Sequence, residues 1–317
     1  MNSTHQIYLA PFQGVTTHTF IRVYSAHFPF ISKYYTPFFS KIDHDTRLSS
    51  RKERELQQLS PGLPEVVPQI LSKDPVEILR FARICESRGF KELNWNLGCP
   101  FPQVAYKKRG SGMLPFPELI DEILDQIMPL MPVRFSIKCR LGYANKDEIL
   151  HLIPIFNQYP LHELTIHGRI GRQLYSGVSD NDTLANIKPI ISVPFVHNGD
   201  IFSVEDFRSV SIKIPDNTKW MIGRGILYNP FLPEDILLKR TDYNRIQKLL
   251  NFTNDLYLAY RNDMQERLTV LNVLKEYWDY LVNFFENPQK VKRIIKKVKN
   301  FDEYEQAIKR IFDSPID

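Results

Sequence analysis

Cysteine is scarce in this sequence, and several motifs that depend on fixed spacing are missing. The 317 residues include three cysteines, Cys85, Cys99 and Cys139. An odd, low count argues against a disulfide-stabilised secreted domain and suits a reducing cytosol. The sequence has no C-x-x-C pair, no P-loop and no G-x-G-x-x-G fingerprint after a first strand. We therefore expect no metal site and no dinucleotide-binding site of the Rossmann type.

Long apolar runs are also absent. No segment approaches the roughly 18 apolar residues that cross a bilayer. The first residues, MNSTHQIYLA, lack the charged and apolar regions of a signal peptide. These absences predict a cytoplasmic protein without a membrane partner. The net charge of +5 is a mild excess, which permits an anionic partner without requiring one.

Short apolar runs, by contrast, recur regularly through the first three quarters of the sequence. Eight of them are typical of strands, at residues 7–10, 31–39, 66–70, 93–96, 135–138, 164–167, 195–198 and 220–223. Segments with helical spacing lie between them, including residues 75–85, 116–128 and 146–156. Asp74 before Pro75 is the expected N-cap of the first of these. This alternation predicts an α/β fold, a (β/α)8 TIM barrel, with an open doubly wound sheet as the alternative.

The pattern changes near residue 236. Beyond it the sequence has no strand signals and almost no glycine, and long helical stretches cover residues 243–260 and 266–285. We therefore predict two domains, a catalytic barrel over residues 1–236 and a small all-helical domain over residues 237–317.

Most of the predicted strands end in a polar residue or a glycine. These residues are Gln69, Asn96, Lys138, His167, Asn198 and Gly223. In a barrel all such ends converge on one face, where active sites lie. In an open sheet only those near the switch point would meet.

Cys99 lies between Gly98 and Pro100, just where a strand-like run stops. Proline has no N–H to give to a ladder, so the thiol is expected to project from a strand end into a loop. A free thiol has a pKa of about 8.5 and is mostly protonated at neutral pH, which suits a general acid at least as well as a nucleophile. Cys85 and Cys139 are predicted to be structural.

Other strand ends admit two interpretations each. Lys138 is either solvated at a barrel edge or a charge partner for an anionic cofactor. His167 and Gln69 either satisfy the core or contact a ligand. The glycine-bearing turns at residues 196–201 and 221–226 follow the seventh and eighth predicted strands, where barrels commonly bind a phosphate.

With these residues in view, the sequence resembles the tRNA-dihydrouridine synthase family over residues 7–232. Five motifs carry the resemblance in order, and the one around the cysteine is the most specific. They are Ala10-Pro-Phe-Gln-Gly-Val-Thr16, Asn96-Leu-Gly-Cys-Pro100 with Val104 and Gly110, His167-Gly-Arg169 with Gln173 and Tyr175-Ser-Gly177, Asn198-Gly-Asp-Ile201, and Gly223-Arg-Gly225 with Asn229-Pro230.

The resemblance implies a barrel that holds FMN, which NADPH reduces. The flavin would then deliver hydride to C6 of a uridine in tRNA, and Cys99 would protonate C5 to give 5,6-dihydrouridine. It also implies which residues contact the cofactor. These are Pro11, Phe12, Gln13, Gln69, Asn96, Lys138, His167, Asn198, Gly199, Asp200, Gly223 and Arg224.

RNA contacts are expected at two basic segments. Residues 289–299 hold six cations and no acid, and helical spacing predicts Lys292, Lys296 and Lys299 on one face; the alternative is a merely solvated face. Lys107, Lys108 and Arg109 lie close to Cys99 in the sequence. We also expect Arg169 to contact RNA and the protein to be a monomer.

The sequence departs from the family pattern at positions that bear on the target uridine. Thr17 stands where the family often has aspartate, and Ile21 where it has arginine. Three alternatives remain at this point. They are an FMN barrel acting on a free pyrimidine, as dihydroorotate dehydrogenases do, a dihydrouridine synthase acting on ribosomal RNA, and an RNA-binding protein without turnover.

Overall fold

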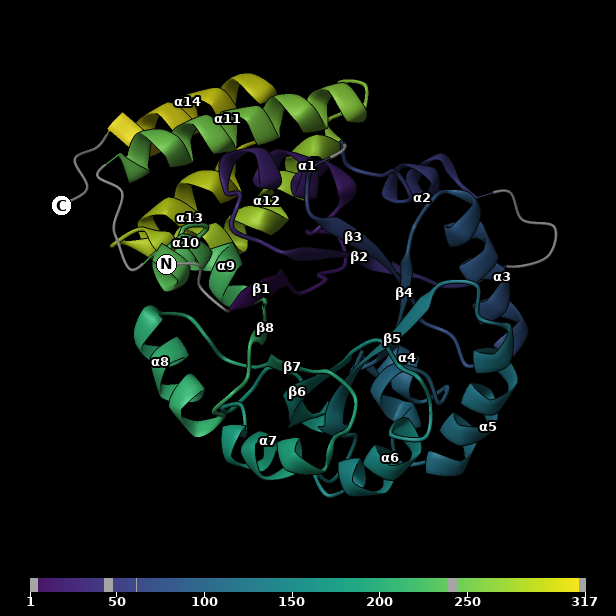
Figure 1. The fold of residues 1–317 in the computed structure, drawn as a ribbon. Coiled ribbons are helices and arrows are strands. Elements are labelled where there is room, and N and C mark those ends of the chain that lie inside the picture. The colour runs from purple at the N-terminus through teal and green to yellow at the C-terminus, as the bar shows by residue number, and fades with distance from the viewer. Residues whose placement is uncertain (1–4, 43–47, 61, 239–243, 314–317) are drawn as a thin grey trace.

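Eight parallel strands close into a barrel in the computed structural model (Figure 1), which describes residues 5–42, 48–60, 62–238 and 244–313. The strands follow one another around the barrel in sequence order. They are β1 Gln6–Leu9, β2 Lys33–Phe39, β3 Glu65–Ile70, β4 Glu92–Leu97, β5 Arg134–Gly142, β6 Leu164–Ile170, β7 Phe195–Asn198 and β8 Lys219–Ile222. The pairing of β1 with both β2 and β8 closes the sheet. The predicted barrel is thus confirmed over the open sheet.

Helices surround the strands as an outer ring (Figure 1). They are α1 His18–His27, α2 Ser50–Glu55, α3 Pro75–Ser87, α4 Pro102–Ala105, α5 Pro117–Ile127, α6 Glu148–Phe156, α7 Asn181–Ile187, α8 Val204–Lys213, α9 Arg224–Tyr228 and α10 Leu232–Leu238. Asp74 caps α3 as predicted, because its side chain accepts from the Val76 N–H at 2.9 Å. Cys85 on α3 and Cys139 on β5 are fully buried and free.

Alternation along β5 explains how one strand serves both the core and the pocket. Side chains of a strand point to opposite faces in turn. Ile137, Cys139 and Leu141 belong to the core that the helices cover, while Lys138 and Arg140 line a pocket inside the barrel mouth. This strand runs to Gly142, four residues beyond the end that its sequence predicts.

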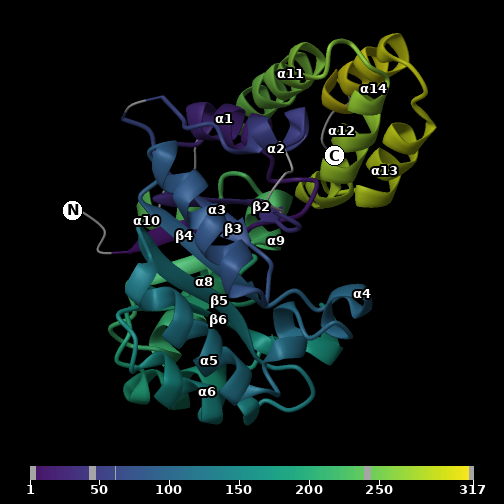
Figure 2. The same cartoon turned by 90° about the vertical axis from the view of Figure 1, so that its right-hand side faces the viewer.

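Beyond the barrel, the described residues form four further α-helices. They are α11 Arg245–Asp263, α12 Thr269–Leu281, α13 Pro288–Lys297 and α14 Phe301–Asp313. Figure 2 shows them gathered at one side of the barrel, with α13 and α4 projecting toward the same side. Phe252 of α11 packs edge-on against Phe20 and Tyr24 of α1, so the helical region is attached through an aromatic contact.

Helix bounds in this region differ from those predicted. The stretch predicted at residues 243–260 forms α11 at residues 245–263, and residue 243 lies outside the described residues. The stretch 266–285 starts its helix only at Thr269, because Gln265 and Glu266 have φ of 54° and 57° and turn the chain. The basic helix α13 ends at Lys297, and Val298 is extended. Lys299 therefore lies beyond the helix and does not share the face predicted for it.

The predicted domain boundary between residues 236 and 237 falls inside α10, and the division into two domains remains a prediction. None of the helices that the structure describes is long and apolar enough to cross a membrane.

Candidate active site

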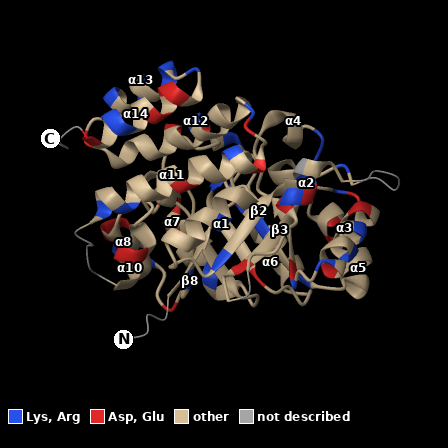
Figure 3. Cartoon of the chain, turned by 90° about the horizontal axis from the view of Figure 1, so that it is seen from above, with Lys and Arg blue, Asp and Glu red and all other residues tan. Residues whose placement is uncertain are grey.

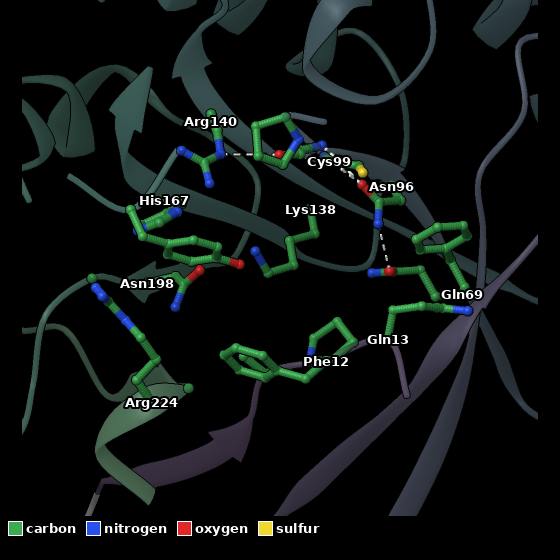
Figure 4. Close-up of a pocket in the computed structure, with 18 of the residues that line it drawn as sticks. Phe12, Gln13, Gln69, Asn96, Cys99, Lys138, Arg140, His167, Asn198 and Arg224 are labelled. Atoms are coloured by element: carbon green, nitrogen blue, oxygen red, sulfur yellow. Dashed lines mark hydrogen bonds between the residues drawn. The ribbon is translucent and has the colours of Figure 1, made fainter. Parts of the chain in front are cut away.

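The polar strand ends converge on one pocket at the carboxyl-terminal mouth of the barrel (Figure 4). Cys99 and all the predicted cofactor-binding residues line it. These are Pro11, Phe12, Gln13, Gln69, Asn96, Lys138, His167, Asn198, Gly199, Asp200, Gly223 and Arg224. The convergence is what barrel geometry predicts for strand ends. Their binding roles stay predictions.

Hydrogen bonds from two strands hold the backbone next to Cys99. Asn96 Oδ1 accepts from the N–H of Gly98 at 3.0 Å and of Cys99 at 2.9 Å. Arg140 Nε donates to the Gly98 carbonyl oxygen at 3.0 Å. One side-chain oxygen thus satisfies two consecutive amides, and the loop leaves β4 in a defined direction.

Gly110 and Ser111 support the same loop from the other side. The backbone N–H and the hydroxyl of Ser111 both donate to the Cys99 carbonyl oxygen at 3.0 Å. Gly110 has φ of 55°, and a Cβ there would lie 2.6 Å from that oxygen. Only glycine fits such a close approach at positive φ. This accounts for the glycine at position 110 in the motif that follows Cys99.

The Cys99 thiol is poised to keep its proton. Its residue is 7% exposed, and burial raises its pKa; the Phe101 N–H and the charges of Arg140 and Lys138 oppose that rise without cancelling it. The group is therefore a thiol at neutral pH. A buried thiol beside two cations can donate a proton and leave a thiolate that those cations stabilise.

Cations dominate the rest of the pocket. Lys138 reaches into its centre (Figure 4) and has no hydrogen-bond or ion-pair partner among the described residues. Burial, then the charge of Arg140, lowers the pKa of Lys138 to about 8. Burial and the same cations lower the pKa of His167 well below its usual range, so this imidazole is neutral. The pocket therefore favours an anionic or electron-rich ligand.

Asp200 lines the pocket and also binds two arginines of the protein. Its Oδ1 accepts from Arg224 at 2.8 Å and from Arg169 at 2.9 Å, and its Oδ2 accepts from the Ser179 N–H at 3.1 Å. Burial would raise its pKa, but the hydrogen bond from Arg169 and the two guanidinium charges lower it overall. Asp200 thus orients two arginines.

The assignment of Arg169 to RNA stays a prediction, and the burial of this residue argues against a contact at the surface. The residue is 1% exposed, and its guanidinium also donates to the carbonyl oxygens of Ser176 and Gly177 at 3.2 and 2.7 Å. In this structure the guanidinium therefore serves contacts inside the protein. The His-Gly-Arg motif does not reveal this, because Asp200 lies 31 residues away.

The loops after β7 and β8 leave a narrow cradle. A Cβ at Gly199 would lie 2.6 Å from Ser179 Oγ, and one at Gly223 would lie 2.9 Å from the Phe12 ring. The Arg224 guanidinium stacks near Tyr175 at 4.9 Å from the ring centre. Bare backbone beside a fixed planar cation is a donor set that fits a phosphate.

Several pocket residues were missed from the sequence. Arg140 follows Lys138 by two positions and so shares its face of β5, a signal that a longer predicted strand would have given. Glu276 and Tyr280 line the pocket from α12, and Tyr280 packs edge-on against Phe12. No local pattern could have placed a helix from the last quarter of the chain over the barrel mouth.

The predicted RNA contacts have mixed positions. Lys107 and Lys108 are exposed and follow α4, and Lys108 Nζ lies 4.1 Å from the centre of the Phe116 ring. Arg109 is half-buried.

On α13, Lys296 is exposed, whereas Lys292 pairs with Asp279 at 2.7 Å. Figure 3 shows basic segments on α13 next to α14, which carries both basic and acidic residues. A second cationic row lines the groove between these helices, formed by Lys290, Arg293 and Lys297. These three residues follow helical spacing and constitute what we call the groove row.

A candidate metal cluster lies at the opposite end of the barrel. Glu92, His162 and Glu163 bring ligand atoms within 4.8 Å of one another, the one such group among the described residues. Lys33 Nζ already lies 2.8 Å from Glu92 and 2.7 Å from Glu163. An ammonium between the carboxylates compensates their charge, so the cluster is an internal ion-pair network.

Comparisons with known proteins agree with this geometry. A family model described as Dihydrouridine synthase (Dus) matches residues 8–315. The tRNA-dihydrouridine synthase B of Pasteurella multocida is 31% identical over 72% of this chain and 68% of its own length. The Escherichia coli protein of the same name is 32% identical over 56% of this chain and 54% of its own length. The matched segments thus span about half to two thirds of these relatives.

A solved structure supports the fold alone. Histamine dehydrogenase from Rhizobium sp. 4-9 aligns with a TM-score of 0.56 and 9% identity, over 84% of this chain and 50% of that one. The family match extends across the barrel and the helical region alike, and it includes every motif from which the resemblance was first stated. The chain belongs to the dihydrouridine synthase family.

Proposed function

We propose that this protein reduces the C5=C6 bond of specific uridines in tRNA to 5,6-dihydrouridine, with FMN as its cofactor and NADPH as the reductant. The observation that carries the proposal is the position of Cys99, a thiol with a raised pKa at the edge of a cationic pocket. The relatives named tRNA-dihydrouridine synthase B support the choice of substrate.

The residues present fit an FMN molecule. The bare backbone of Gly199 and Gly223, with Arg224 beside it, suits the phosphate end. Lys138 has no protein partner among the described residues, and with Gln69 it would contact the ring. Uncompensated charge in a buried pocket is costly unless an anionic or polar ligand completes it, so this lysine favours a ligand of that kind.

Bound flavin supplies the hydride chemistry, and the protein supplies position and a proton. Cys99 Sγ donates its proton to C5 of the uracil while C6 receives the hydride. Arg140 and Lys138 then stabilise the thiolate, since both charges act to lower the pKa of Cys99. Asn96 keeps the loop in place through its two backbone hydrogen bonds. Solvent returns the proton to sulfur after product release.

The tRNA must present its uridine unstacked before a buried pocket can reach it. We assign backbone contacts to Lys107, Lys108 and Arg109 beside the pocket and to the cations of α13. The helical region would act as the RNA-binding domain of a monomeric enzyme. The three cysteines are free, which is compatible with a protein that functions in the reducing cytosol.

The test is direct. The purified full-length chain should release FMN on denaturation, and with NADPH it should form dihydrouridine in tRNA. Free uracil, orotate and ribosomal RNA serve as parallel substrates. Release of FAD or of no flavin would overturn the cofactor assignment, and turnover confined to a free pyrimidine or to ribosomal RNA would overturn the substrate.

A further inference from the structure

A continuous chain of hydrogen bonds runs through the barrel interior toward the Cys99 loop. It begins at Glu92, the first residue of β4, whose Oε1 accepts from Ser136 Oγ at 2.5 Å. Asn94 Nδ2 donates to Ser136 Oγ at 2.9 Å. Gln69 Nε2 in turn donates to Asn94 Oδ1 at 2.8 Å. The first links thus connect three neighbouring strands below the pocket.

The last links reach the reacting end of the barrel. Asn96 Nδ2 donates to Gln69 Oε1 at 2.7 Å. Asn96 Oδ1 then accepts from the N–H groups of Gly98 and Cys99 at 3.0 and 2.9 Å. Gln69 and Asn94 are 0% exposed and Ser136 is 1% exposed. Bulk water therefore cannot replace a missing partner in the lower part of the chain.

Both ends of this chain fix its direction. The Glu92 carboxylate, paired with Lys33 at 2.8 Å, accepts hydrogen bonds, while a backbone N–H only donates. Each amide between them has one orientation that satisfies both neighbours. If Asn94 reversed its amide, two oxygens would face each other at Ser136 unless that hydroxyl turned from Glu92, and two N–H groups would face each other at Gln69.

We propose that Ser136 and Asn94 are positioning residues for the Cys99 loop. They act through Gln69 and Asn96, whose amide orientations they set, and so hold the backbone that carries the thiol. Barrel interiors are usually filled with branched apolar side chains, and a buried polar group is costly unless it is fully bonded. The polar chain is therefore retained for orientation. Only its relevance to the reaction rests on the proposed function.

Hydrogen–deuterium exchange of the full-length protein, followed by mass spectrometry, tests the proposal without RNA. The peptide to follow covers residues 96–105, which includes the amides of Gly98 and Cys99. Ser136→Ala removes the central hydroxyl, and Ser136→Thr restores one. Thr165→Val is the matched control, because Thr165 is 1% exposed and its hydroxyl has no hydrogen-bond partner in the part of the chain that the structure describes.

The alanine variant should exchange these amides about tenfold faster than the wild type, since the chain loses a buried hydrogen bond. The threonine variant should restore slow exchange, and Thr165→Val should leave it unchanged. Asn94→Ala breaks the next link and should reproduce the effect if Ser136→Ala does not fold.

Unchanged exchange in the folded alanine variant would overturn the proposal. So would an equal increase in Thr165→Val, because the cause would then be a generally loosened barrel. Failure of the proposed function shows separately, as the absence of dihydrouridine formation by the wild type. The two results are therefore independent.

Discussion

Asp200 and Arg169 form an ion pair in which the arginine is almost entirely buried, with side-chain exposures of 22% and 1%. The same carboxylate also binds Arg224 at 2.8 Å. Asp200 is therefore the link between a buried cation of β6 and the cation predicted to face a phosphate, and its charge matters to both.

Replacing Asp200 by asparagine should lower the free energy of unfolding by on the order of 2–3 kcal/mol, because Arg169 loses the charge that compensates its burial. The folded-state pKa of Asp200 is depressed, so its stabilising charge is present above the unfolded pKa of about 3.9. It is lost as pH falls through the lower folded pKa. Chemical denaturation of both proteins from pH 7 to pH 3 should show the difference shrinking below about pH 4. A pH-independent difference would contradict this account.

Cys99→Ala should fold, keep its flavin and lose most turnover on tRNA. A general acid typically contributes about 10²–10⁴-fold to rate, and reduction of flavin by NADPH needs no proton donor to uracil. Stopped-flow absorbance follows that half-reaction, and mass spectrometry of digested tRNA follows the other. Cys85→Ala and Cys139→Ala are the controls and should retain activity. Full reduction of tRNA by Cys99→Ala would remove the cysteine from the mechanism.

Lys138→Met should stabilise the flavin-free protein while weakening flavin retention. The folded pKa of Lys138 is about 8, well below the roughly 10.4 of an unfolded lysine, so its charge opposes folding at neutral pH. The gain, about 1–3 kcal/mol, is fully present below pH 8 and disappears as pH rises toward 10.4. Thermal unfolding of apoprotein at several pH values measures it, and flavin titration measures retention. A less stable variant that binds flavin normally would mean that Lys138 is an ordinary solvated residue.

Arg224→Ala should retain flavin about tenfold to a hundredfold more weakly, since a charge-assisted contact typically contributes about 1.5–3 kcal/mol. Equilibrium dialysis of FMN gives the affinity directly. Riboflavin, which lacks the phosphate, should bind the variant and the wild type alike. An equal loss for riboflavin would place Arg224 outside the phosphate site.

Replacing the groove row, Lys290, Arg293 and Lys297, with glutamine should weaken tRNA binding similarly for all tRNAs. The salt dependence of binding should fall by somewhat under one unit for each lost phosphate contact, about 0.7–0.9. The matched control replaces the originally predicted row, Lys292, Lys296 and Lys299, and removes the same number of charges. Its effect should be smaller, because Lys292 already pairs with Asp279 and Lys299 lies beyond the helix. Equal salt slopes for the two triples would show that the groove is not the RNA path.

The sequence predicts the barrel well because parallel strands are buried on both faces. Runs such as Phe195–Asn198 therefore read as apolar segments with sharp ends. β5 is the informative exception, since Lys138 and Arg140 alternate with buried residues and a charged position looks like a strand end. A strand whose polar face points into the barrel can be recognised from its alternation of polar and apolar residues. The alternation has to be followed past the first charged residue.

The sequence could predict which residues line the pocket, but it could not predict how these residues contact one another. Glycine turns and strand ends marked the residues that converge, since every barrel strand delivers its end to the same face. The partner of Arg169 could not be found this way, because the contact with Asp200 depends on the register of β6 against β7 and the loops beyond. On α13, helical spacing alone does not say which face α12 and α14 cover, so it could reveal neither the ion pair of Lys292 nor the end of the helix before Lys299.

One wall of the pocket comes from α12, which supplies Glu276 and Tyr280 opposite the barrel loops. A chimera that joins this barrel to the helical region of a relative would consequently exchange part of the pocket wall together with the surface that we propose to face RNA. Such a chimera would therefore change the choice of uridine and the rate of the reaction together. An engineer who wishes to redirect the enzyme to another uridine would have to keep these two side chains while changing the helices around them.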